Sequence, residues 1–157
     1  MADRDRDASG RPLNARPRDG LGRPLPRSAA GVARVSDGCV LPPEAALAEA
    51  QRLLDEGMPF HAHEVLEGSW KSAPEPEREL WQGLAQLAVA LAHALRGNRS
   101  GAISLLRRGR GRIAGYAPAP PHGIDVAGLV IWADRLVAEL EHEDGRAPSV
   151  PTLRGRR

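Results

Sequence analysis

The sequence predicts an all-α fold: a single domain of about five helices, formed by two helical hairpins plus a C-terminal helix, with extended N- and C-terminal tails. Three observations support this prediction. Residues 80–95 carry no formal charge, although 27% of the whole chain is charged. Apolar residues recur at helical spacing through residues 41–144. Residues 1–40 and 145–157 lack that periodicity and are rich in Pro, Gly and Arg.

The segment 80–95 is predicted to be the central buried helix. Its leucines share one stripe of a helical projection, and alanines and a valine make the other faces apolar. The leucines of the stripe are Leu80, Leu84, Leu87, Leu91 and Leu95. Only Gln82, Gln86 and His93 interrupt the apolar surface, and they form one narrow polar stripe.

Local signals mark where the other helices begin and end. Prolines at the first helical positions open a helix after Leu41 and a second one, roughly 59–71. Glycines at 57 and 97, forty residues apart, are predicted to end the first and the central helix. A fourth helix is expected over about 99–116, and Asp125 is expected to cap the last one.

Length and cysteine content limit the class of protein. A chain of 157 residues can bury a real core in one domain, and the single Cys39 excludes an internal disulfide framework. The N-terminus is polar, and residues 80–95 are too short and too polar to span a bilayer. We therefore expect a cytoplasmic protein without membrane attachment.

Charge is segregated along the chain. Residues 1–40 contain eight Arg and five Asp, and residues 145–157 contain four Arg and no acidic residue, whereas residues 41–144 have an acidic excess. The sequence Arg-Asp-x-x-Gly-Arg-Pro-Leu begins at Arg6 and again at Arg18. Residues 1–40 are interpreted as an extended or disordered low-complexity arm. Alternatively, the arm docks on the core through Leu13 and Leu25, with Arg pairing to core carboxylates.

The densest group of possible ligands lies on the second helix. His63 and Glu67 are separated by four residues and can face one point, with Glu64 beside them where a general base would lie. The spacing resembles the zinc-protease motif His-Glu-x-x-His with Glu67 in place of the second His. A divalent metal held by His63 and Glu67 would need a third ligand, for which His93 is the candidate.

A structural role is the alternative for the same residues. Because buried polar groups need partners, His63 and Glu67 could tether the second helix to the polar stripe of the central helix. In this interpretation Glu64 or Glu67 accepts a hydrogen bond from Gln82 or Gln86. Trp70 is placed on the buried face of the second helix, and His61 is expected at the surface.

The fourth helix contains a run of basic residues at Arg107, Arg108, Arg110 and Arg112. Such a run is a candidate nucleic-acid contact, but it is more often a solvated face when no aromatic or loop motif accompanies it.

Three separated motifs resemble a known family. They are Phe60-His-Ala-His-Glu-Val-Leu-Glu-Gly-Ser-Trp70, then Trp81-Gln-Gly-Leu-Ala-Gln-Leu-Ala, and then His93 followed by Arg96-Gly-Asn-Arg-Ser-Gly-Ala-Ile-Ser-Leu-Leu106. They resemble the small bacterial family called domain of unknown function 309, over about residues 44–114. The resemblance implies an all-helical domain with no assigned activity. It also implies that the family pattern includes His63, Glu64, Glu67, Trp70, Gln82, Gly83, Gln86 and Asn98.

These observations favour a non-enzymatic helical interaction module that binds protein, or nucleic acid through its Arg-rich tails. The alternative is a metal-dependent hydrolase that uses the His-Glu-x-x-Glu site of the second helix. No cofactor other than a possible divalent metal is expected. The sequence does not identify the partner.

Overall fold

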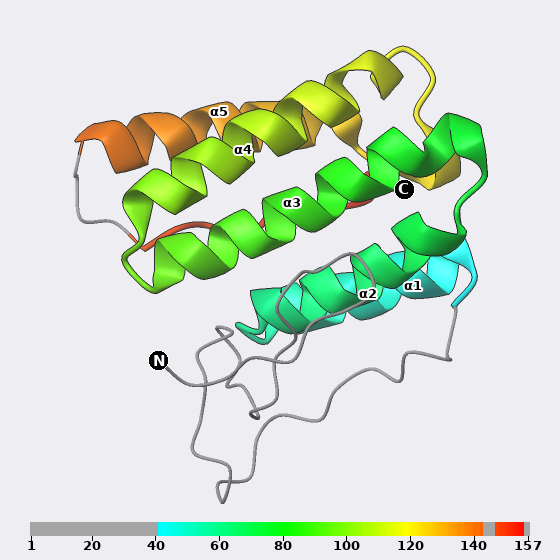
Figure 1. Ribbon diagram of the computed structural model, residues 1–157, viewed down its shortest axis with the longest axis horizontal. Helices are drawn as coiled ribbons and strands as arrows, with labels where there is room; N and C mark the ends of the chain where they lie inside the picture. The colour runs from blue at the N-terminus through cyan, green and yellow to red at the C-terminus, as the bar shows by residue number, and fades with distance from the viewer. Residues whose placement is uncertain (1–40, 143–146, 156–157) are drawn as a thin grey trace, which may run out of the picture.

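The computed structural model describes residues 41–142 and 147–155 and shows five α-helices (Figure 1). They are α1 (Pro43–Asp55), α2 (Pro59–Ser72), α3 (Arg78–Leu95), α4 (Arg99–Ile113) and α5 (Val126–His142), with 3-10 turns η1 (Glu75–Glu77), η2 (Ala114–Tyr116) and η3 (Pro121–Gly123). The described part of the chain contains no strand, so the all-α prediction is confirmed. None of its helices combines the length and the apolar character that a membrane span requires.

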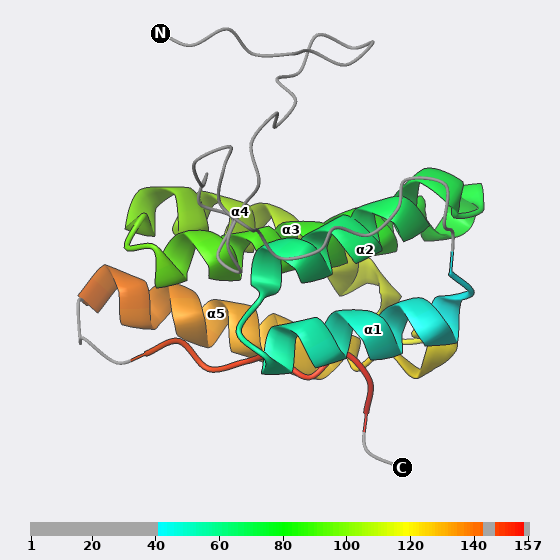
Figure 2. The ribbon, with the colours of Figure 1, turned by 90° about the horizontal axis from the view of Figure 1, so that it is seen from below.

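The helices form two layers. Figure 2 shows α2, α3 and α4 side by side in one layer and α1 and α5 in the other. Consecutive helices pack on one another, and α3 lies between α2 and α4. Ten residues of α3 are buried, more than in any other described helix, which confirms it as the central element; the face with Gln82, Gln86 and His93 is only half-buried. This helix therefore makes the largest single contribution to the core.

The two predicted glycine turns have the same geometry. Gly57 and Gly97 take φ values of 77° and 85°, which a residue with a Cβ rarely adopts. In each turn the amide after the glycine donates to the carbonyl five residues back: Met58 N to Leu53 O at 2.8 Å, and Asn98 N to His93 O at 2.9 Å. This is the Schellman pattern that ends a helix. Asn98 then caps α4, where its Oδ1 accepts from Gly101 N at 3.2 Å.

Asp125 performs the predicted capping role at the last helix. Its Oδ1 accepts from Gly128 N at 3.1 Å. The apolar stripe of α5 packs inward through Val126, Leu129, Ala133 and Leu136, which are all buried. The predicted fourth helix ends three residues early, because residues 114–116 tighten into the η2 turn.

The C-terminal segment differs from its prediction. The Pro, Gly and Arg content of residues 145–157 predicts a disordered basic tail, but residues 147–155 lie along the layer of α1 and α5 (Figure 2). Gln51 of α1 binds this segment twice, with Leu153 N donating to Gln51 Oε1 at 2.8 Å and Gln51 Nε2 donating to Pro151 O at 3.0 Å. The segment also binds α5, where Trp132 Nε1 donates to Ser149 O at 3.0 Å. Leu153 is 3% exposed and Pro151 is also buried, so apolar burial holds this segment against the core despite its polar composition.

The predicted N-terminal arm, residues 1–40, lies outside the described residues, as do residues 143–146.

Candidate functional site

The predicted polar cluster on α2 is present only in part. His63 Nε2 lies 3.0 Å from Glu67 Oε2, and Lys71 Nζ lies 3.5 Å from Glu67 Oε1. The hydrogen bond from His63 lowers the pKa of Glu67 to about 2, against the opposing effect of burial, and the His63 and Lys71 charges add to the lowering. Glu67 is therefore ionised and paired within its own helix.

The polar residues of α3 have other partners than those proposed for a tether. Gln86 Oε1 accepts from Arg112 Nε of α4 at 3.1 Å. His93 Nδ1 lies 3.0 Å from Asn98 Nδ2 and 3.3 Å from Arg96 Nη2, at the end of its own helix. Burial lowers the pKa of His93, and the Arg96 charge lowers it further, which keeps its Nδ1 available as an acceptor. Gln82 is half-buried on α3.

Three buried polar atoms on α2 have no hydrogen-bond partner among the described residues: His61 Nδ1, His63 Nδ1 and Glu64 Oε1. His61 is 1% exposed, so its predicted surface position is wrong. It follows Phe60 at the start of the helix and points into the core, where its ring meets the Phe60 ring edge-on at 6.3 Å. Trp70 is half-buried and packs against the core. No three His, Cys, Asp or Glu side chains of the described residues gather as a metal site.

Arginines of the basic run on α4 form ion pairs with the neighbouring helices α3 and α5. Arg107 Nη2 lies 3.3 Å from Glu141 Oε1, and Arg110 Nε lies 3.0 Å from Asp134 Oδ1, both on α5. On the other side Arg112 Nη1 reaches both carboxylate oxygens of Glu79 on α3 at 2.9 Å. Arg107 and Arg108 are both exposed, and Arg108 forms none of these ion pairs. Three of the four arginines in this run thus form ion pairs with neighbouring helices.

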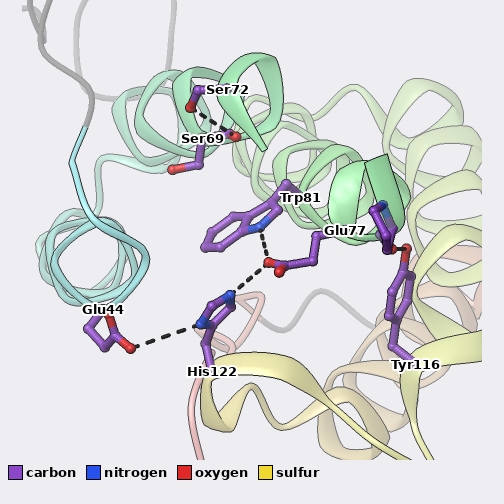
Figure 3. A network of polar contacts seen from close by, with 8 residues as sticks. Glu44, Ser69, Ser72, Glu77, Trp81, Tyr116 and His122 are labelled. Atoms are coloured by element: carbon purple, nitrogen blue, oxygen red, sulfur yellow. Dashed lines mark hydrogen bonds and ion pairs between the residues drawn. The ribbon is translucent and has the colours of Figure 1, made fainter. Parts of the chain in front are cut away.

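A cavity that the sequence did not reveal opens where four separate segments of the chain meet. Its volume is about 500 Å³. It lies between the start of α1, the end of α2, the η1–α3 junction and η3 (Figure 3). The lining residues are Leu41, Pro42, Pro43, Ser69, Ser72, Ala73, Pro74, Glu77, Trp81 and His122.

Glu77 is the centre of the polar network in this cavity (Figure 3). Its Oε1 accepts from Trp81 Nε1 at 3.2 Å and lies 2.7 Å from His122 Nε2. Burial raises the pKa of Glu77, but the hydrogen bonds from His122 and Trp81 and the His122 charge lower it more, so its pKa lies below the ordinary value of 4.5. The carboxylate is therefore held in place and remains charged.

His122 has an unusual backbone conformation. Its φ of 57° lies in the left-handed region, and Gly123 beside it has a φ of 73°. The C-terminal segment holds this turn, since Gly155 N donates to Gly123 O at 3.1 Å and Ile124 pairs with Arg154 in an antiparallel bridge. Such a conformation costs on the order of 1–3 kcal/mol and persists only where its surroundings impose it. The C-terminal segment thus helps to position His122 in the cavity.

The second nitrogen of His122 faces a carboxylate and not a hydroxyl group. His122 Nδ1 lies 3.9 Å from Glu44 Oε1. Ser72 Oγ donates to Gly68 O at 3.0 Å, within its own helix. A nucleophilic serine needs a base that accepts its proton. Because both imidazole nitrogens point to carboxylates, the arrangement suits binding better than nucleophilic catalysis.

Sequence reasoning missed this site for an identifiable reason. In the sequence, Glu77 is one of three glutamates close before residues 80–95, and His122 lies in a proline-rich link. The two residues are separated by 45 positions. The single available signal was a His next to Gly in an apolar, proline-rich loop.

Comparison with known proteins adds a family match over part of the chain but no activity. The chain matches "Uncharacterized protein YpuF" of Bacillus subtilis (strain 168) with 48% identity over 48 residues. This match covers 30% of the chain and 28% of the relative, so the chain spans less than a third of that protein's length. No solved structure gives a significant match. Residues 47–105 match the family described as Domain of unknown function (DUF309), which confirms over those residues the resemblance indicated by the three motifs.

Proposed function

We propose that the protein is a non-enzymatic helical interaction module that binds an extended segment of protein in the cavity between α1, α2, α3 and η3. The observation that carries this proposal is the composition of the cavity wall. Three prolines, a leucine, an alanine and the Trp81 indole form an apolar surface around the Glu77 carboxylate. Apolar walls with a few fixed polar groups are typical of ligand sites.

The charge of the cavity indicates which segment it would accept. Glu77 lies inside it, and Glu44 and Glu75 belong to the elements that border it, with side chains that are 62% and 87% exposed. Carboxylates repel phosphate and attract guanidinium groups, which they bind through paired hydrogen bonds. A basic, proline-containing segment is therefore favoured over RNA or DNA.

Titration of the full chain with short peptides, followed by ¹H–¹⁵N NMR, tests the proposal. A basic proline-containing peptide should shift the indole signal of Trp81 and the backbone signals of η1 and η3, and added salt should weaken the binding. A peptide with Glu in place of its Arg should cause no such shift. Shifts confined to α4, or produced equally by RNA, would overturn the proposal.

One matched pair of variants tests the role of charge. Glu44→Gln removes a carboxylate next to His122, whereas Glu56→Gln removes an exposed one at the far end of α1. We expect peptide affinity to fall about twofold to fivefold in Glu44→Gln, as the loss of one charge pair worth ~0.5–1 kcal/mol predicts. Glu56→Gln should bind like the parent. Equal affinities of both variants and the parent would remove the electrostatic part of the proposal.

A metal-dependent hydrolase is the second candidate. Buried polar atoms without partners, His63 Nδ1 and Glu64 Oε1, are the observation in its favour. His63 and Glu67 would hold the metal, which would supply an activated water. The fit is incomplete, because His63 Nε2 is paired with Glu67 and no third His, Cys, Asp or Glu of the described residues joins them. Calorimetric titration with zinc and manganese decides this point, since stoichiometric binding that His63→Ala abolishes would favour the hydrolase.

A further inference from the structure

The cavity has a wall whose chemistry matches a repeated tripeptide of the same chain. Arg-Pro-Leu occurs at residues 11–13 and again at 23–25, each time preceded by Gly. We propose that the cavity binds the Arg-Pro-Leu repeat of the chain's own N-terminal arm. This inference rests on the function proposed above and names its occupant.

The apolar part of the repeat fits the apolar part of the cavity. Proline holds φ near −65°, and the residue before it is pushed to an extended conformation, so Arg-Pro-Leu presents its side chains from an extended backbone. Such segments are recognised in grooves that aromatic residues line. Trp81, Pro42 and Pro74 provide this type of surface for Pro and Leu. A volume of about 500 Å³ accommodates a few residues rather than a folded partner.

The basic part of the repeat fits the carboxylates. Glu77 Oε1 accepts from Trp81 and His122, so this carboxylate is already oriented before a ligand arrives. An incoming guanidinium meets Glu77 within the cavity and Glu44 at its border. Glu44 lies beside the cavity, since its Oε1 is 3.9 Å from His122 Nδ1. Arg is suited to this contact because its planar fork can bind a carboxylate through two hydrogen bonds.

The segment that joins the arm to the core is long enough for the arm to bind the cavity of its own molecule. Leu41, which lines the cavity, lies sixteen residues after Leu25, and a chain of that length spans up to about 50 Å. The segment 23–25 can therefore return to the cavity. A tethered ligand meets its site at an effective concentration in the millimolar range, so even a weak Arg-Pro-Leu contact would be well populated.

A spin label on the full chain tests the inference. In a Cys39→Ser background, Ser28→Cys carries a nitroxide three residues after Leu25. We expect the label to broaden the indole signal of Trp81 strongly and to leave that of Trp132 on α5 unchanged, at every protein concentration. Changing both repeats together should remove the broadening; this variant carries Arg11→Ser, Leu13→Ser, Arg23→Ser and Leu25→Ser.

A matched control removes two Arg and two apolar residues of the arm outside the repeats. It carries Arg27→Ser, Val32→Ser, Arg34→Ser and Val35→Ser, and its Trp81 signal should stay broadened. Loss of broadening in both variants would overturn the inference, because the contact would then depend on composition and not on the repeat. Loss of broadening on dilution would also overturn it and would assign the cavity to the arm of a second copy.

A synthetic peptide separates this inference from the proposed function. The peptide Gly-Leu-Gly-Arg-Pro-Leu-Pro is added to the variant with both repeats changed, and its binding is followed by the Trp81 signal. A shift there, together with broadening in the labelled parent, supports both proposals. A shift without broadening in the parent leaves the binding function intact and defeats the self-docking inference, and no effect in either experiment defeats both.

Discussion

Gly83 and Gly109 face each other where α3 and α4 pack. A Cβ on Gly83 would lie 3.0 Å from the carbonyl oxygen of Gly109, and a Cβ on Gly109 would lie 2.9 Å from the carbonyl oxygen of Gly83. The contact is reciprocal and involves backbone, which cannot rotate away as a side chain can. The close approach of the two helices therefore depends on glycine at both positions.

Gly109→Ala should lower the free energy of unfolding by roughly 1–3 kcal/mol, because the added methyl group forces α3 and α4 apart. Gly111 of the same helix is the control, since a Cβ there meets nothing within 4 Å. Gly111→Ala should stabilise the protein by up to about 1 kcal/mol through helix propensity. Urea denaturation of the two variants checks this, and a shift of both midpoints in the same direction would contradict it.

Leu87 is a second point at which stability can be tested. It is 2% exposed on α3, and Leu87→Ala should cost on the order of 2–5 kcal/mol because it leaves a cavity in the core. Arg108→Ala on the exposed face of α4 should change the unfolding midpoint very little. Equal midpoints for Leu87→Ala and the parent would mean that α3 is not the central helix.

Gln51 connects α1 to the C-terminal segment by two hydrogen bonds. Gln51→Ala should cost roughly 1–3 kcal/mol, because the partly buried Leu153 amide and Pro151 carbonyl lose their partner. Hydrogen exchange of the Leu153 amide should become faster. Exchange of the α3 amides should accelerate only by the amount that the loss of global stability predicts. Unchanged exchange at Leu153 would show that Gln51 does not hold the segment.

Glu67 should make stability depend on pH in the acidic range. Its pKa is lowered to about 2 in the folded chain from an ordinary value of 4.5, so its stabilising effect is fully present above 4.5 and disappears as pH falls towards 2. Glu67→Gln should therefore cost about 1–2 kcal/mol at neutral pH, once solvent screening is allowed for, and almost nothing near pH 2. Thermal unfolding across this range measures the difference, and a pH-independent cost would refute the assignment.

Glu77, in the cavity, should also make the free energy of unfolding decrease as the pH falls below 4.5. Its lowered pKa means that its contribution to stability is present above 4.5 and declines as pH falls further. Glu77→Gln keeps an acceptor for Trp81 Nε1 but loses the charge next to His122, so its destabilisation should be greatest above 4.5. The fluorescence of Trp81, compared with that of Trp81→Phe, reports whether the indole environment changes over the same pH range.

Several features were predictable from the sequence because they depend on residues close together in the chain. The leucine stripe of α3, the glycine turns at Gly57 and Gly97 and the cap at Asp125 each follow from neighbours within one or two turns of helix. The same is true of the His63–Glu67 pair, which lies on one face of α2. For this pair the spacing predicted proximity but not whether a metal or an ion pair would use it.

Other features depend on which helix faces meet, and only the tertiary structure decided them. Gln86 binds Arg112 and not a residue of α2, because α3 also packs against α4 and a guanidinium from that side reaches the amide oxygen. His61 is buried, although its helical position alone suggested the surface. Arg107 and Arg110 of α4 form ion pairs because α5 places Glu141 and Asp134 beside them.

By itself, the sequence determined the number of helices, their order and the central one, since helix formation and termination are governed by local periodicity and caps. The tertiary structure decided that residues 147–155 pack between α1 and α5 and that Glu77, Trp81 and His122 share a cavity with the start of α1. No local pattern specifies such contacts. They depend on the free energy gained when distant surfaces are removed from water together, and that gain is defined only when the whole chain is folded.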